Sequence, residues 1–431
     1  MAYITFITTY KPIICGIADY SDFLTRESTP GTWAVITFDL DNFVVPFSDD
    51  LIELTTPVSY CIPSREDYTA DSISKWLKLK EAHVLWFQHE FGIWGNGVRF
   101  TNMLRELNDV TVVSPHTLHF QSNETTYGLR KFEDSFLRSL LPSTDAITVF
   151  SDGVYSAVTR AFPEYSDKVH VMRHGTHCYP TIARMSRAEA KAKIYDYLMY
   201  ESNLDQASKD RIQRENVFTD PATTLIGGTG FITANKGIEL IYQVRNTLLK
   251  MLPQQKMVAV YVGFLREPDN IIDGGCAAKL RAKYNGSGQF FLENYLPEEM
   301  LPIMLRAFDI HFYWPGDCTQ SGIIAHALGA GATIACRDME GVGETVKMAG
   351  GLARSELGQL ITGIKELILN PELRDEISQR AVRYAMKFSW KNQALKHFEL
   401  AEELCRSKAK RSITGSTLLL SASLKENRLP L

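Results

Sequence analysis

Short apolar runs alternate with amphipathic segments along most of the chain, and the two periods predict strands joined by helices. The apolar runs of the first series are residues 3–8, 33–38, 84–87, 110–114, 146–150 and 169–172. Between these runs lie segments whose apolar residues have the spacing of a helix: residues 17–26, 70–80, 98–107, 129–140 and 153–162. Continuous apolar runs are typical of parallel strands buried on both faces, so this alternation predicts a doubly wound α/β sheet.

A second alternating series begins at residue 223. Its predicted strands are residues 223–227, 257–262, 289–292, 310–313 and 333–335. Its predicted helices are residues 237–251, 277–283, 297–306, 322–329, 355–369 and 371–387. Each series has about the size of one Rossmann-like domain, so the predicted fold class is α/β with two such domains in tandem.

The segment between the two series is charged, helix-prone and poor in glycine and proline over residues 184–216. We interpret it as a helical linker or insertion, and favour a solvated spacer over a coiled coil because no heptad is sustained. The predicted domains are therefore residues 1–180 and 221–387, with the linker at 181–220. An amphipathic helix is predicted over residues 388–405, and the tail, 406–431, has no clear period and is expected to be mobile.

Composition narrows the class of protein further. The chain has 431 residues and a formal net charge of −4, which gives no support to a basic nucleic-acid-binding surface. Its seven cysteines are scattered, without a CxxC pair, as expected for free thiols in a reducing compartment. The start of the chain lacks a basic segment before its short apolar run, and no apolar stretch is long enough to span a bilayer. A cytoplasmic location is the expectation.

Contact with a membrane surface is left open by two groups of basic residues. Lys75, Lys78 and Lys80 share one predicted helix, and residues 406–411 form a basic run. Such groups can touch anionic lipid, although a solvated basic face is the more common explanation. The sequence does not give an oligomeric state.

A candidate phosphate site lies between the predicted strand 310–314 and the apolar run 332–336. Pro315, Gly316 and Asp317 break the strand, and Gln320, Ser321 and Gly322 then open a helix of small residues. A helix start presents unpaired backbone N–H groups and the positive end of the helix dipole. Both attract anions, phosphate above all, so this loop predicts a phosphorylated ligand.

Lys236 is the candidate cation for the same ligand. It follows the glycine-rich stretch 227–230 and precedes Gly237. A lysine placed at a helix start supplies positioned charge for a pyrophosphate leaving group. A P-loop is excluded because glycine follows the lysine, and Thr233 replaces the third glycine of a dinucleotide motif. The alternative is a solvated lysine without a ligand.

His116 ends an apolar strand, with His119 three residues later. A metal site is the obvious alternative, but a pair of histidines without a nearby cluster of carboxylates is weak evidence for a zinc site. Asp39 and Asp41 form a DxD string that we interpret as a solvated turn after the second strand. No other set of metal ligands is apparent, so neither a bound cation nor another cofactor is expected.

Taken together, the loops after the strands resemble those of the retaining GT-B glycosyltransferases of family 4, which use a nucleotide-sugar donor. The matching stretches are 11–18, VLWFQHEFGIWG at 84–95, VVSPHTLHF at 112–120, VHVMRHGTH at 169–177, LIGGTGFITANKGIELI at 225–241, PGDCTQSGIIAHALGAGATIA at 315–335 and FSWKNQALKHF at 388–398. The resemblance extends from Tyr3 to about Cys405, nearly the whole chain.

The resemblance implies two domains that face each other across a cleft, with the C-terminal helix crossing back to the first domain. It implies retaining, metal-independent transfer of a hexose from a UDP- or GDP-sugar to a saccharide or other hydroxyl acceptor. By this resemblance, His116 donates a hydrogen bond to the donor sugar and Lys236 binds the donor diphosphate. The other implied donor-binding residues are Gly16, Gly230, Asp317, Gln320, Ser321, Gly322, His326 and Glu344. Glu90 remains open between an acceptor-side and a structural role.

Two departures from the family pattern bear on activity. Phe231 stands where many members have an arginine that pairs with the lysine, and the E-x7-E pair maps onto Cys318 and His326. Asp317 lies beside the first position and could partly replace that glutamate, and a histidine can still hydrogen-bond hydroxyl groups. The alternative function is therefore a catalytically inactive GT-B scaffold, acting as a partner subunit or a carbohydrate-binding module. A sugar phosphorylase on the same fold ranks below both.

Overall fold

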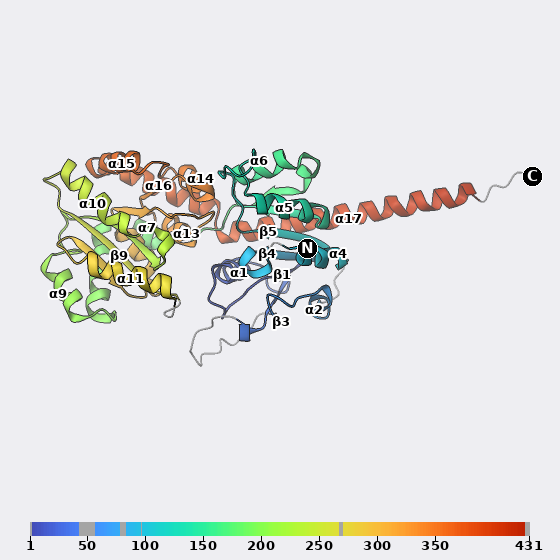
Figure 1. The fold of residues 1–431 in the computed structure, drawn as a ribbon, viewed down its shortest axis with the longest axis horizontal. Helices are drawn as coiled ribbons and strands as arrows, with labels where there is room; N and C mark the ends of the chain where they lie inside the picture. The colour runs from blue at the N-terminus through green and yellow to red at the C-terminus, as the bar shows by residue number, and fades with distance from the viewer. Residues whose placement is uncertain (1, 43–56, 78–82, 96, 267–269, 427–431) are drawn as a thin grey trace, which may run out of the picture. The chain divides into compact units, whose positions relative to one another are not determined.

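The computed structural model describes residues 2–42, 57–77, 83–95, 97–266 and 270–426 (Figure 1). The chain divides into two compact units. Unit 1 consists of Met1–Arg173 together with Trp390–Leu431, and unit 2 is His174–Ser389. Each unit contains one parallel sheet covered by helices on both faces, so the predicted α/β architecture of two Rossmann-like domains is confirmed.

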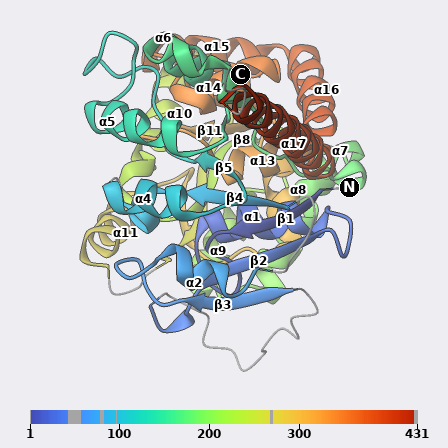
Figure 2. The ribbon, with the colours of Figure 1, turned by 90° about the vertical axis from the view of Figure 1, so that its right-hand side faces the viewer.

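The sheet of unit 1 has seven parallel strands in the order β3-β2-β1-β4-β5-β6-β7. Figure 2 labels the first five of them in this order, from β3 to β5. The strands are β1 (Tyr3–Ile7), β2 (Trp33–Phe38), β3 (Val58–Ile62), β4 (His83–His89), β5 (Val110–Pro115), β6 (Ala146–Val149) and β7 (Val169–Val171). The helices are α1 (Gly16–Arg26), α2 (Ala70–Ser74), α3 (Phe91–Trp94), α4 (Val98–Glu106), α5 (Lys131–Leu140), α6 (Asp152–Ala161) and α17 (Trp390–Glu426).

Alternate residues of the central strand β4 build two separate cores in unit 1. Leu85 and Phe87 pack with α2 to α6 on one face, whereas Val84 and Trp86 pack with α1 and α17 on the other. Successive side chains of a strand point to opposite faces, so a strand that is apolar at every position is buried on both. The chain thus returns to unit 1 through α17, whose Phe398 and Ala401 belong to the second core.

The sheet of unit 2 has six parallel strands in the order β10-β9-β8-β11-β12-β13. The strands are β8 (Thr224–Phe231), β9 (Met257–Phe264), β10 (Gln289–Glu293), β11 (Ile310–Tyr313), β12 (Ile334–Arg337) and β13 (Leu352–Arg354). The helices are α7 (Pro180–Arg184), α8 (Arg187–Asp196), α9 (Gln206–Arg214), α10 (Glu239–Met251), α11 (Ile271–Lys283), α12 (Met300–Ala307), α13 (Gly322–Gly329), α14 (Glu340–Met348), α15 (Leu357–Leu369) and α16 (Pro371–Lys387).

Strand β9 divides the interior of unit 2 in the same way. Ala259 and Tyr261 pack with α10, α11 and α15, while Val258, Val260 and Val262 pack with α8 and α12. A third core lies among α12, α13, α14 and α16 around β12. The two faces of the sheet therefore carry different helices.

The predicted strands and long helices correspond to elements of the structure, with ends shifted by a few residues. The elements that were not predicted include the edge strands β3 and β13 and the helices α3 and α14. The predicted helix 70–80 is shorter, because α2 ends at Ser74, and residues 78–80 with Lys78 and Lys80 lie outside the described residues. The last helix is longer than predicted, since α17 continues from Trp390 to Glu426.

The interpretation of residues 184–216 as a solvated spacer is wrong. The segment is helical, as expected, but Ala190, Ile194 and Ile212 are fully buried against the core that contains Val258 and Val260. Lys191, also buried, donates hydrogen bonds to Asp309 (2.7 Å) and to the backbone carbonyl of Thr223 (2.9 Å). Apart from Lys191, most of the charged side chains that suggested a spacer lie on the outer face of these helices.

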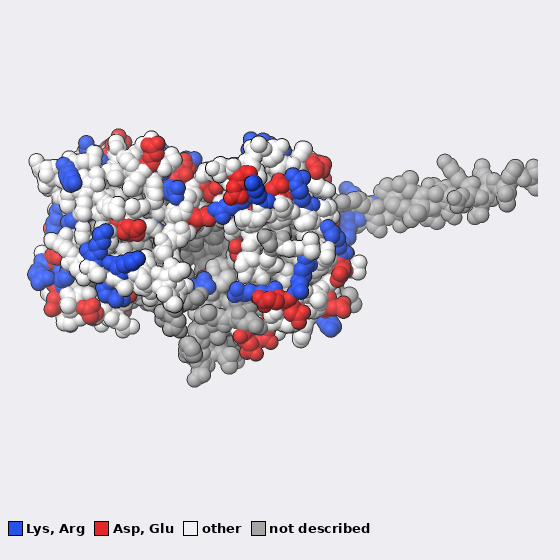
Figure 3. Space-filling model, in the orientation of Figure 1, with Lys and Arg blue, Asp and Glu red and all other residues white. Residues whose placement is uncertain are grey.

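Basic and acidic side chains of the described residues are interspersed on the face shown in Figure 3. No helix among the described residues is both long enough and apolar enough to cross a membrane.

The buried face of α8 yields a stability prediction. Replacing Ile194 with alanine should lower the free energy of unfolding by about 2–5 kcal/mol, because the side chain is fully buried in a core. Ile272→Ala on α11 is the matched control, since Ile272 is 73% exposed and its loss should change stability by less than about 0.5 kcal/mol. Urea unfolding of both variants measures the difference. Equal effects would contradict the packing of α8 on unit 2.

Candidate functional site

The strand order of unit 2 reverses between β8 and β11, which are neighbours in the sheet. Chain connections leave in opposite directions from such a point, and open parallel sheets bind ligands beyond the strand ends there. The loop after β8 carries Lys236, and the loop after β11 carries Asp317, Gln320 and Ser321. The fold therefore brings most of the predicted site residues of unit 2 to one place.

One backbone and one side-chain hydrogen bond join these two loops. The amide of Gly316 donates to the carbonyl of Asn235 at 2.7 Å, and the side-chain amide of Asn235 donates to the carbonyl of Asp317 at 3.0 Å. Arg337, at the end of β12, donates to the carbonyls of Pro315 and Gly316, each at 3.1 Å. The loop after β11 is thus held from both sides, by Asn235 and by Arg337.

The close approach of these two loops also requires a glycine at position 237. Its backbone is left-handed, with φ of 59°, and a Cβ atom there would lie 2.4 Å from the carbonyl oxygen of Trp314. An L-residue would meet both a conformational penalty and a clash with backbone that cannot rotate away. Glycine at this position lets the turn that carries Lys236 lie directly against the start of the loop after β11.

Lys236 is half-buried, and its ammonium group lies 5.6 Å from the ring centre of Phe231. Within the described part of the chain it forms no ion pair. Loss of hydration lowers the pKa of Lys236 to about 8, while Cys318 and Asp273 act weakly in the opposite direction. The ammonium group is therefore still mostly protonated at neutral pH, and no described carboxylate lies close enough to form an ion pair with it.

Gly230 links the lysine to helix α13. A Cβ atom on Gly230 would lie 3.2 Å from Lys236 Nζ and 3.3 Å from the side chain of Ile323. The ammonium group and the first turn of α13 consequently flank the same glycine. Tyr261 fixes the backbone there by donating its hydroxyl to the carbonyls of Gly230 (3.2 Å) and Phe231 (2.9 Å).

The start of α13 presents unpaired amides. Ser321 is the N-cap, and its hydroxyl accepts a hydrogen bond from the amide of Ile324 at 3.4 Å. The amides of Gly322 and Ile323 have no acceptor among the described residues. Cys318 donates to the carbonyl of Gln320 at 2.9 Å, and this turns the loop before the cap. A positive helix end and the Lys236 ammonium group thus lie together, an arrangement suited to an anion.

The remaining predicted residues of unit 2 have partners within the protein. His326, on the second turn of α13, is hydrogen-bonded through Nδ1 to the hydroxyl of Tyr179 at 2.7 Å and stacks on His177 with ring centres 3.8 Å apart. Burial, helped by the nearby His174, lowers the pKa of His326 to about 4, so its ring is neutral. Glu344 lies on α14 and is half-buried.

Gly16 and His116 belong to unit 1 rather than unit 2. His116, at the end of β5, is 8% exposed, and its Nε2 is hydrogen-bonded to Gln88 Oε1 at 2.7 Å. Its ring also packs edge-on against Tyr20, with centres 4.7 Å apart. Gly16 is the first residue of α1, and no atom lies within 4 Å of the position of a Cβ there, so the backbone is openly accessible.

Glu90 lies at the end of β4 in unit 1. Its carboxylate accepts a hydrogen bond from the Thr117 hydroxyl at 2.5 Å. Burial raises the pKa of Glu90 above its usual range, and the hydrogen bond from Thr117 opposes that change. The two residues connect the ends of β4 and β5.

Asn235, Tyr261 and Arg337 were not predicted from sequence, although they fix the site. Their partners are remote in sequence, so no local pattern reveals them. Of the residues that fix the site, only Gly237 could be recognised in the sequence, as the glycine directly after Lys236. No group of three or more histidine, cysteine, aspartate or glutamate side chains among the described residues is arranged to hold a metal ion.

Comparisons with known proteins identify the fold. No family model matches the chain, and no curated protein matches it in sequence. Solved structures of the GT-B fold do match over almost their full length. The UDP-forming α,α-trehalose-phosphate synthase of Burkholderia xenovorans, in complex with glucose-6-phosphate, is 11% identical with a TM-score of 0.64, covering 93% of this chain and 100% of that one.

Two further solved structures match this chain over a similar length. An E. coli trehalose-6-phosphate structure bound with UDP-2-fluoro glucose is 11% identical with a TM-score of 0.63, covering 93% of this chain and 99% of that one. HepE of Anabaena, in complex with UDP, is 14% identical with a TM-score of 0.64, covering 94% of this chain and 100% of that one. The chain therefore has the GT-B fold.

Substitution of Gly237 tests the junction of the two loops. Gly237→Ala should destabilise the protein by at least about 1–2 kcal/mol, because the left-handed backbone disfavours a Cβ even before the clash with Trp314. Gly274→Ala is the matched control: it lies within α11 with no atom within 4 Å of its Cβ position, so alanine should stabilise that helix by about 0.5–1 kcal/mol. Denaturant unfolding measures the free energy of unfolding of both variants, which should fall for Gly237→Ala and rise for Gly274→Ala. A neutral Gly237→Ala variant would contradict the described junction.

Proposed function

We propose that the protein is a glycosyltransferase that transfers a hexose from a nucleotide-sugar to a hydroxyl acceptor, with retention at the anomeric carbon. Unit 2 would bind the donor at the loops after β8 and β11. Lys236 and the amides of Gly322 and Ile323 would hold its diphosphate. Gly16 and His116 are retained as candidate donor-contacting residues of unit 1.

The observation that carries this proposal is the pairing of Lys236 with the start of α13. A half-buried ammonium group without an ion pair in the described chain flanks Gly230 together with a helix end whose first amides are unpaired. Both are positive: no described carboxylate forms an ion pair with Lys236, and no described group accepts a hydrogen bond from these amides. A diphosphate would supply the missing negative charge and acceptors.

The same groups suit the chemistry of transfer. The bond between the anomeric carbon and the diphosphate oxygen breaks, and its electron pair leaves with the diphosphate. The acceptor oxygen forms the new bond to that carbon on the same face, and its proton passes to the departing phosphate oxygen. Lys236 and the amides of α13 would stabilise the charge that develops on the leaving group, because they are positioned before the reaction begins.

The matched structures support a nucleotide-sugar as donor. One holds UDP-2-fluoro glucose, another holds UDP, and a third holds glucose-6-phosphate. By analogy, a UDP-sugar is the first donor to test, with a GDP-sugar as the alternative, and a saccharide or sugar phosphate is a reasonable class of acceptor. We further propose that transfer needs no metal ion and that the protein acts in the cytoplasm.

A second candidate function is an inactive GT-B scaffold that serves as a partner subunit or binds carbohydrate. His326 favours it, because one ring nitrogen is engaged by Tyr179 and the ring stacks on His177. Cys318 likewise points its sulfur to the carbonyl of Gln320 and to the Tyr313 hydroxyl. Neither contact blocks Lys236, so nucleotide binding is compatible with both functions.

Nucleotide binding tests the site. UDP or GDP should bind the unmodified chain at least about 10-fold more tightly than Lys236→Ala, since a charged hydrogen bond contributes about 1.5–3 kcal/mol. Calorimetry measures both affinities. Lys250→Ala, which removes an exposed lysine from α10, is the control and should bind as the unmodified chain does.

The pH dependence provides a separate check on the same site. A bound diphosphate raises the pKa of Lys236 above its value of about 8, because the opposite charge favours the protonated form. Affinity should therefore be constant near neutral pH and fall as pH rises through that value. Lys236→Ala should lack this fall. Identical pH profiles for the two proteins would rule out the ammonium group as the ligand for the diphosphate.

Turnover separates the enzyme from the scaffold. A panel of UDP- and GDP-sugars is incubated with the chain, with and without saccharide and sugar-phosphate acceptors, and released nucleotide is measured. An active transferase should release nucleotide faster with an acceptor than Lys236→Ala does, because only the intact site stabilises the departing diphosphate. Nucleotide binding without any release would instead assign the chain to the inactive scaffold.

A further inference from the structure

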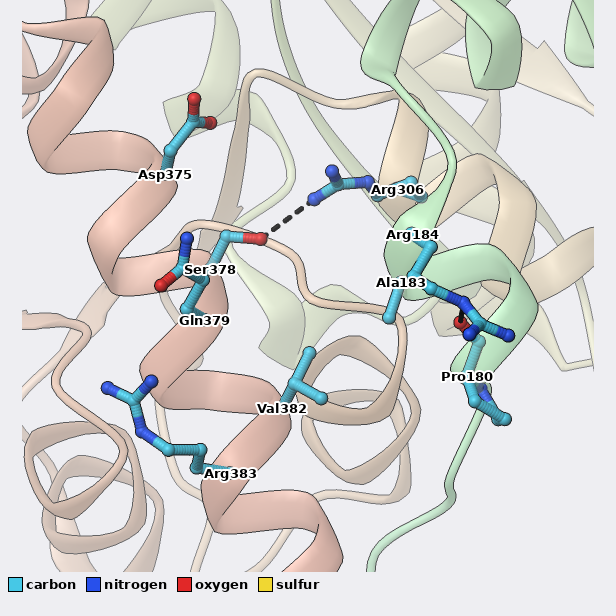
Figure 4. Close-up of a pocket in the computed structure, with 9 residues that line it drawn as sticks. All are labelled: Pro180, Ala183, Arg184, Arg306, Asp375, Ser378, Gln379, Val382 and Arg383. Carbon is cyan, nitrogen blue, oxygen red and sulfur yellow. Dashed lines mark hydrogen bonds between the residues drawn. The ribbon is translucent and has the colours of Figure 1, made fainter.

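A hollow of about 500 Å³ lies among α7, α12 and α16 of unit 2 (Figure 4). Its volume is within the range of about 300–1,000 Å³ that is typical of small-molecule sites. Arg184, Arg306 and Arg383 line it, together with Ser378 and Gln379. None of these residues belongs to the loops after β8 and β11, so the hollow is separate from the proposed donor site.

Arg306 is the fixed charge of this hollow. The residue is 9% exposed, and its Nε donates to the carbonyl of Met185 at 2.8 Å. Its Nη1 donates to the carbonyl of Gly331 at 2.9 Å and to the Ser378 hydroxyl at 2.8 Å, as the dashed line in Figure 4 shows for Ser378. Its Nη2 has no acceptor among the described residues. A buried guanidinium group is thus positioned entirely by neutral partners.

Arg306 forms no ion pair with a carboxylate of the described residues. Asp375 is the single acid among the described residues that line the hollow, and it pairs with Arg187 at 2.9 Å. Burial, reinforced by Arg187 and opposed by Asp375, lowers the pKa of Arg306 to about 10, which leaves the group protonated at neutral pH. Arg306 is therefore a buried cation without an ion pair to any described acid, a state that an external anion would stabilise.

Two more arginines stand on opposite walls. Arg184 rises from α7 and Arg383 from α16, and Figure 4 shows their guanidinium groups on the two outer flanks of the hollow. Arg184 donates to the carbonyl of Pro180 at 3.1 Å, and neither arginine forms an ion pair with a described acid. Both side chains are long, so each can rotate toward an anion held at Arg306.

The middle of the hollow is apolar. Ala183 and Val382 face each other between the two outer arginines in Figure 4. Pro180 extends the same surface along α7. This arrangement suits a ligand with a charged group at one end and a short carbon skeleton, whose carbon atoms would cover the apolar wall.

We propose that the hollow is a second ligand site of this protein, which binds a small phosphate monoester. The phosphate accepts hydrogen bonds from Arg306 Nη2 and from the guanidinium groups of Arg184 and Arg383, and the carbon skeleton lies against Ala183 and Val382. A phosphate is favoured over a carboxylate because three guanidinium groups match a dianion with three terminal oxygens.

Calorimetric titration of the full chain with glycerol 3-phosphate tests the proposal. Binding should be weakened at least about 10-fold in Arg184→Gln/Arg383→Gln, whose side chains lie at the surface and can be changed without disturbing a core. Lys250→Gln/Arg380→Gln is the matched control, because it also removes two exposed cations from helices of unit 2, and it should bind normally. Lys236→Ala should also bind normally.

Each other result overturns the proposal. Failure of glycerol 3-phosphate to bind would show that the hollow is not a site for a small phosphate monoester. Equal weakening of binding in the control double variant would show that the arginines contribute only general positive charge. Loss of binding in Lys236→Ala would assign the phosphate to the start of α13 instead. If a decamer of glutamate binds through Arg184 and Arg383 more tightly than glycerol 3-phosphate does, the hollow is a protein-docking surface and not a small-molecule site.

Discussion

The hydrogen bonds between Asn235 and the loop after β11 are the contact on which the candidate site of unit 2 depends. They join two turns that are about eighty residues apart in sequence, at the point where the strand order reverses. Gly237 permits this approach because its backbone is left-handed and it has no side chain to meet Trp314. The junction thus holds the turn that carries Lys236 against the loop that leads into α13.

The fold was largely predictable because burial on both faces of a parallel sheet leaves continuous apolar runs. Strands β2 and β11 and helices α13 and α16 have the predicted bounds. The missed elements lack that signal. Strand β3 is half-buried along most of its length, β13 has three residues, and α14 begins with Glu340 in a left-handed conformation followed by Gly341. Their formation depends on tertiary contacts more than on local preference.

The candidate site was predictable only where its signals are local. A glycine-rich stretch before Lys236 and a small-residue helix after Ser321 can be recognised within a few residues. The contacts of Asn235, Arg337 and Tyr261 cannot, because their partners come from other strands and loops. The error over residues 184–216 has a related cause: the buried apolar side chains of this segment are spread among many charged ones over α8, α9 and the turns between them, so the face that packs on the sheet is hard to recognise.

Helix α13 connects the two positive regions of unit 2. Its N-terminal end faces Lys236, and the carbonyl of Gly331, two residues beyond its C-terminal end, accepts hydrogen bonds from both Arg306 and Ser378. A cation near the C-terminal end of a helix is favourable for the helix dipole, so Arg306 stabilises α13 while it keeps one nitrogen without a described acceptor. The helix spans only about 12 Å, since it has eight residues. A single short element thus holds the start that presents amides to an anion and the end that positions a buried guanidinium group, and its packing between α12, α14 and α16 fixes both at once.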